Sequence, residues 1–75
     1  MERVAMFNRQ ALIGELVSIG TGEYSRGHGE YNMMIAFMAD DWLVKKQKSK
    51  KFRITLRSIE KDAEGYIMIT IMFIE

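Results

Sequence analysis

The alternation of hydrophobic and polar residues is clearest near the end of the chain. Phe52, Ile54 and Leu56 alternate with charged or polar residues, a period of two that is typical of a half-buried strand. A turn-like Lys-Asp-Ala-Glu-Gly segment follows, and the chain then becomes apolar at odd and even positions alike. The pattern predicts an antiparallel hairpin of residues 51–60 and 65–74. Because the second strand needs cover on both sides, we expect it to be central in a sheet, inside a barrel or at a subunit interface.

The earlier part of the chain is less regular. Residues 30–39 are predicted to form a third strand, and residues 20–29, which hold four of the six glycines, a loop or hairpin tip. Residues 11–19 fit a strand, which we favour, and also a helix with Asn8 as its N-cap. The two acids at positions 40–41 either begin a short helix or follow the end of a strand.

These elements predict a single small domain over residues 1–75 with a mostly β fold. We expect a small antiparallel sheet or a partly open barrel of about four strands. The alternative is an α+β fold, in which an N-terminal helix over about residues 8–19 packs on a three-stranded antiparallel sheet.

Composition limits how so short a chain is stabilised. The 75 residues include no cysteine, which excludes disulfides and Cys-ligated metals, and the hydrophobic fraction of 48% argues against disorder. Chains of this size bury a modest core, so homo-oligomerisation is a natural source of further burial. The absence of cysteine, and of a sustained apolar stretch in residues 1–7, predicts a soluble cytoplasmic protein that does not enter the membrane.

The charges of the chain are unevenly distributed. Residues 1–41 carry three basic and six acidic groups, whereas residues 42–75 carry eight basic and four acidic groups. Six of the eleven basic residues fall within nine positions that are flanked by aromatic residues. The candidate nucleic-acid-binding residues are Trp42, Lys45, Lys46, Lys48, Lys50, Lys51, Phe52 and Arg53. Because lysines neutralise phosphates and aromatic rings stack on bases, this run predicts an interface for single-stranded DNA or RNA.

The order of these features resembles the opening of bacterial single-stranded DNA-binding proteins. Residues 7–16, Phe-Asn-Arg-Gln-Ala-Leu-Ile-Gly-Glu-Leu, look like the first strand of that family, although Glu15 stands where the family usually has a basic residue. An apolar strand over 33–39 and Trp42, near the position of a base-stacking tryptophan, follow. The resemblance implies an oligomeric OB-fold barrel with a cationic groove and stacking aromatic residues.

No catalytic or metal-binding pattern is apparent. His28 is the only histidine, and no second ligand or nucleophile stands at a recognised spacing from it. The glycine-rich segment lacks the lysine of a phosphate-binding loop. We therefore expect neither an enzyme nor a bound cofactor. Methionines on two of the strand candidates suit an adaptable protein interface: Met33, Met34, Met38, Met68 and Met72.

Two functions follow from these expectations. The first is non-catalytic binding of single-stranded nucleic acid through the basic loop and its flanking aromatic residues. The alternative is a small interaction or inhibitor protein, of the kind that phages and mobile elements encode, which binds a host protein through its β-sheet.

Overall fold

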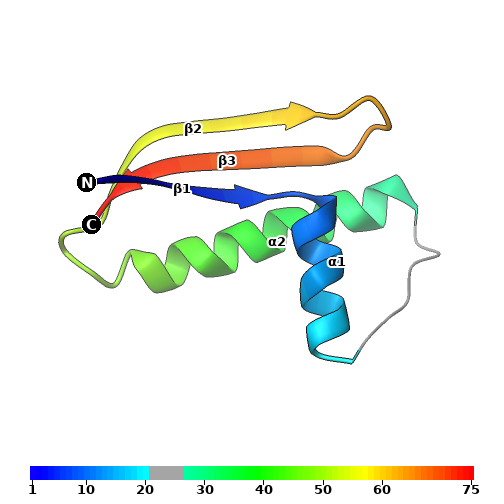
Figure 1. The fold of residues 1–75 in the computed structure, drawn as a ribbon, viewed down its shortest axis with the longest axis horizontal. Coiled ribbons are helices and arrows are strands. Elements are labelled where there is room, and N and C mark those ends of the chain that lie inside the picture. Colours follow the sequence, from blue (N-terminus) through cyan, green and yellow to red (C-terminus); the bar gives the residue numbers. More distant parts are fainter. Residues whose placement is uncertain (21–26) are drawn as a thin grey trace.

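The computed structural model describes residues 1–20 and 27–75, which form two helices and a three-stranded sheet (Figure 1). In chain order the elements are β1 (Glu2–Phe7), α1 (Arg9–Ser18), α2 (His28–Lys46), β2 (Arg53–Lys61) and β3 (Ile67–Ile74). The fold is α+β, so the prediction of a mostly β fold or a partly open barrel is wrong. The alternative α+β fold, with an N-terminal helix over about residues 8–19 and a three-stranded antiparallel sheet, is confirmed, but it did not include the second helix, α2.

The predicted hairpin is confirmed, and its second strand is central. The strand order is β1-β3-β2, and β3 pairs antiparallel with both neighbours. The register on β2 shifts between Ile54 and Leu56, a β-bulge at Thr55. The sequence pattern did not predict β1, because its Val-Ala-Met-Phe segment is apolar at successive positions and shows no alternation.

Residues 9–18 form a helix, not the favoured strand. The side-chain oxygen of Asn8 accepts a hydrogen bond from the Ala11 N–H at 2.9 Å, as an N-cap does. Leu12 and Leu16, four residues apart, are buried on one side of α1. This burial and the cap outweigh the cost of about 1 kcal/mol for the glycine inside the helix.

The predicted strand over residues 30–39 is also helical. These residues belong to α2, whose inner face is formed by buried residues that recur every four positions: Tyr31, Ile35, Ala39 and Leu43. The continuous apolar run between them masked this period. The acids at 40–41 lie inside α2, which begins at His28, so they neither begin a helix nor follow a strand. The strands that the OB resemblance implies over 7–16 and 33–39 are therefore absent. Most of the predicted loop, residues 21–26, lies outside the described residues.

The helices cover one face of the sheet. Side chains of β3 alternate between the faces, and Ile69, Ile71 and Phe73 are buried against the helices. The core consists of Phe7, Leu12, Leu16, Tyr31, Ile35, Ala39, Leu43, Ile69, Ile71 and Phe73. We call the opposite side the open face. Its register rows contain Val4, Met6, Leu56, Met68, Met72 and Ile74. Among the described residues, no helix is long and apolar enough to cross a bilayer.

Candidate nucleic-acid interface

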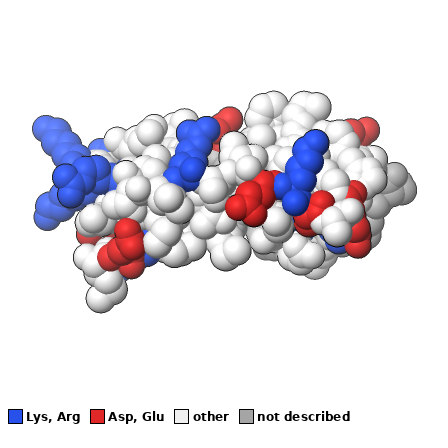
Figure 2. All heavy atoms as spheres, turned by 90° about the horizontal axis from the view of Figure 1, so that it is seen from above, with Lys and Arg blue, Asp and Glu red and all other residues white. Residues whose placement is uncertain are grey.

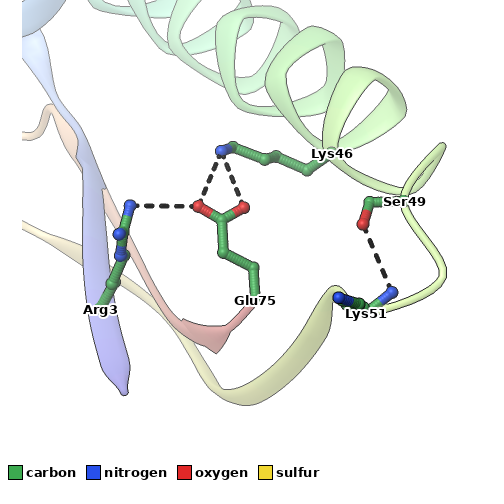
Figure 3. Close-up of polar contacts among 5 residues, drawn as sticks. All are labelled: Arg3, Lys46, Ser49, Lys51 and Glu75. Carbon is green, nitrogen blue, oxygen red and sulfur yellow. Dashed lines mark hydrogen bonds and ion pairs between the residues drawn. The ribbon is translucent and has the colours of Figure 1, made fainter.

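The basic run begins on the last turn of α2 and ends on β2. Lys45 and Lys46 lie where the helix macrodipole favours cations, and the helix ends at Gln47, whose N–H donates to the Leu43 carbonyl at 2.8 Å. The chain then reverses over residues 47–52. The Ser49 hydroxyl helps to close this turn by accepting a hydrogen bond from the Lys51 N–H at 3.3 Å (Figure 3). The turn is called the α2–β2 loop.

The aromatic residues at the ends of the basic run pack together against the core. The ring of Trp42 makes edge-on contacts with Phe7, Phe52 and Phe73, with centroids 5.5, 5.8 and 5.1 Å apart. Phe52 also packs on Phe73, with 5.4 Å between centroids. Trp42 and Phe52 are both partly buried. The cluster therefore holds both ends of the α2–β2 loop against the sheet. The Trp42 ring already packs on three other rings, so a base that stacked on it would compete with these contacts.

Lys46 is held by the end of the chain. Its ammonium lies 3.2 and 3.1 Å from the two carboxylate oxygens of Glu75, which also accepts a hydrogen bond from Arg3 at 3.2 Å (Figure 3). The same ammonium lies 5.7 Å from the ring centroids of Trp42 and Phe73. Lys46 therefore connects α2 to Glu75 at the end of β3 and, through Glu75, to Arg3 on β1.

Lys45 is paired within its own helix. Its ammonium lies 3.0 Å from a carboxylate oxygen of Asp41, one turn earlier. Both side chains are about 70% exposed, with values of 72% and 68%, so the pair contributes little to stability. Its local effect is to neutralise one charge of the basic run.

Four cations of the run remain exposed. Lys48, Lys50, Lys51 and Arg53 are all exposed, and none forms an ion pair with any residue in the described part of the chain. Figure 2 shows Lys and Arg side chains projecting from the end of the molecule at which the α2–β2 loop lies in Figure 1. The predicted interface thus divides into a structural part, Trp42, Phe52 and Lys46, and a solvent-facing part.

A second cluster, which sequence reasoning did not identify, surrounds Tyr66. The Arg9 guanidinium lies 4.1 Å from the centre of the Tyr66 ring and 2.7 Å from a Glu64 carboxylate oxygen. The hydrogen bond with Glu64 raises the pKa of Arg9, and bonding to Tyr66 adds to this effect. His28, expected in a loop, begins α2 instead and packs on Tyr66, with ring centroids 4.5 Å apart. A pocket of about 400 Å³ lies here, lined by Arg9, Gln10, Ile13, Tyr31 and Tyr66.

The polar groups around this pocket are occupied in holding the β2–β3 turn. The Asn32 side chain donates to the Gly65 carbonyl at 3.1 Å and accepts from the Ile67 N–H at 2.9 Å. Asp62 accepts backbone N–H bonds from Tyr66 and Glu64, and the bond from Tyr66 is the main cause that lowers the pKa of Asp62. The cluster therefore has a structural role, and its partners lie far away in sequence, which is why no local motif signals it.

No group of three or more His, Asp and Glu side chains in residues 1–20 and 27–75 is placed to hold a metal ion. Within the same residues, no buried side-chain nitrogen or oxygen lacks a hydrogen-bond partner. The buried polar groups of these residues are therefore all satisfied within the fold. Comparison of the chain with protein-family models, curated proteins and solved structures finds no significant match, so its function is inferred from its own residues.

Proposed function

We propose that this protein binds single-stranded nucleic acid without catalysing a reaction, and that the α2–β2 loop contacts the phosphates. The observation that supports this is the group of four exposed cations, Lys48, Lys50, Lys51 and Arg53, that lack acidic partners within the described residues. Phosphates are the partners that such a group of charges neutralises best. Three of the four are lysines, which act as point charges, so we expect binding with little preference for base sequence.

The proposal keeps the function that the resemblance to single-stranded DNA-binding proteins implied, but not the stacking role of the aromatic residues. Trp42 and Phe52 hold the loop in place by packing on Phe73. Without stacking, affinity depends on charge and falls steeply with salt. For three or four phosphate contacts on a single strand, we expect the logarithm of the binding constant to fall with a slope of about −2 to −3 against the logarithm of salt concentration.

The test is the salt dependence of binding to a labelled oligo-dT, measured by fluorescence anisotropy. The triple variant Lys48→Gln, Lys50→Gln, Lys51→Gln should reduce the magnitude of the slope by about 2, because three phosphate contacts are lost. Lys61→Gln is the control for loss of a lysine charge outside the loop, since Lys61 is exposed at the far end of β2. A triple variant with the slope and affinity of the unmodified protein would rule out the loop as the binding site.

A second candidate function is docking on another protein through the open face. Val4, Met6 and Leu56 on this face are 54%, 59% and 52% exposed, and apolar groups gathered in this way mark interaction surfaces. A protein partner that is retained by the unmodified chain and lost on Leu56→Lys, with oligo-dT affinity unchanged, would support this function.

A further inference from the structure

Apolar side chains on the open face are aligned in rows across the three strands. Val4, Met72 and Leu56 are register partners and form an entirely apolar row. The adjacent row contains Glu2, Ile74 and Arg53, with an acid on one edge strand and a base on the other. The charges of the second row are therefore placed symmetrically about β3 and have opposite signs.

The open face is broad for so small a protein, although its register positions also include Ser58, Glu60 and Thr70. Three strands of about eight residues, about 4.8 Å apart and rising about 3.3 Å per residue, cover roughly 400 Å². Apolar side chains gathered on part of such a face often mark an interaction surface. The described residues include ten that are buried in the core, and the chain has no cysteine, so further burial by association would add substantially to its stability.

We propose that a second copy of the chain packs on the open face, with a two-fold axis parallel to β3. This axis lays β3 over β3 of the partner and each β1 over the partner's β2. The apolar row then faces itself, with Val4 over the partner's Leu56 and Met72 over the partner's Met72. The two sheets form a sandwich about 10 Å thick, with the helices on its two outer sides.

Charge complementarity favours this arrangement. At the end of the sheet where the acidic and basic row lies, the axis places Glu2 opposite the partner's Arg53, and Arg53 opposite the partner's Glu2. Two ion pairs therefore close the apolar interface at one end, and their long side chains span the offset that sheet twist introduces. The alternative is a two-fold axis perpendicular to the strands. This axis pairs Arg53 with the partner's Glu60, but it lays Leu56 and Met72 over the hydroxyl side chains of the partner's Ser58 and the partner's Thr70.

The dimer places both α2–β2 loops at the same end of the assembly, because the axis runs parallel to β3. This placement has a consequence for binding that rests on the proposed nucleic-acid function. One single-stranded nucleic acid can contact both loops, and the second contact is strengthened by the high effective concentration of the second loop. The dimer itself does not depend on that function. It is measured without nucleic acid, through variants outside the α2–β2 loop, so the two proposals fail separately.

The experiment is sedimentation equilibrium of the full chain over a range of concentrations. The unmodified protein should be a weak dimer that forms at about 100 μM, because a face of roughly 400 Å² on each partner is smaller than the interfaces of stable complexes. Glu2→Arg and Arg53→Glu should each raise the dimer Kd about tenfold or more, because each places like charges opposite each other at two symmetric positions. The double variant Glu2→Arg, Arg53→Glu should return the Kd to within about threefold of the original, since it restores both pairs.

The matched control is Arg57→Glu, on the same strand but on the helix-facing side, where its register partner is the buried Ile71. It should leave the Kd within about twofold. Far-UV circular dichroism on each variant separates loss of the dimer from loss of the fold. A monomeric unmodified protein, or no rescue by the double variant, would overturn the proposal. Rescue of Arg53→Glu by Glu60→Arg in place of Glu2→Arg would overturn the axis and favour the opposite orientation.

Discussion

Replacement of Trp42 by alanine tests whether this ring stabilises the fold or binds bases. Trp42 is partly buried and contacts the rings of Phe7, Phe52 and Phe73 at centroid distances of 5.5, 5.8 and 5.1 Å. Truncation of a fully buried Phe or Trp costs about 3–5 kcal/mol, of which each aromatic pair accounts for about 0.5–1.5 kcal/mol. Because part of the Trp42 ring stays in water, we expect the lower end, about 3 kcal/mol.

That loss is large beside the total stability of a 75-residue chain, which is about 4–11 kcal/mol. Urea unfolding followed by far-UV circular dichroism measures it, because the signal of the two helices disappears on unfolding. Phe37→Ala is the matched control on the same helix. Its side chain is 62% exposed, so its truncation should change the free energy of unfolding by less than about 0.5 kcal/mol.

Affinity for oligo-dT is then compared without urea, at a temperature at which both variants remain folded. If Trp42 only anchors the loop, Trp42→Ala should bind within about twofold of the unmodified protein, since the loop lysines are unchanged. A stacking role predicts a loss of about 1–3 kcal/mol of binding free energy per base. Unchanged stability together with a loss of affinity of that size would refute the packing argument.

Two further predictions concern the fold. Asn8→Ala should lower the free energy of unfolding by about 1 kcal/mol in urea titrations, because the N–H of Ala11 loses its cap. Asp62→Asn tests the effect of pH. Since the pKa of Asp62 is lowered in the folded state, the ionised group stabilises the protein above its unfolded pKa of about 4, and this contribution disappears as pH falls through the folded pKa. The difference in urea midpoint between Asp62→Asn and the unmodified protein should therefore be constant above about pH 5 and shrink below about pH 4; a difference independent of pH would contradict the assignment.

The sequence predicts some elements well because their local pattern is decisive. The 51–60 and 65–74 hairpin has one strand of clear alternation and a turn between its strands, and both survive in the structure. Residues 30–39 of α2 have the pattern of a strand because positions 33–38 are all apolar, so a period of four is visible only over the longer span from Tyr31 to Leu43. Strand β1 depends on pairing with β3, more than sixty residues later, and no local signal contains that information.

In the candidate interface, too, contacts between residues close in sequence can be predicted, whereas contacts between distant residues cannot. The pairing of Lys45 with Asp41 is readable from a spacing of four residues on a helix. The pairing of Lys46 with Glu75 is not, because it requires β3 to end beside the last turn of α2. A run of six cations therefore does not translate into six phosphate contacts, and the fold decides which charges remain available.

Arg53 is the residue at which the two proposals meet. It is the last cation of the basic run and the first residue of β2, where its register partner Ile74 places it on the open face. In the proposed dimer Arg53 faces the partner's Glu2, so each loop offers only its three lysines to phosphate. Six lysines on one strand would give a salt slope of about −4, against about −2 for a single loop. The slope should therefore steepen as protein concentration rises through the dimer Kd, and a slope that stays constant across that range would mean that the loops bind independently of the sheet face.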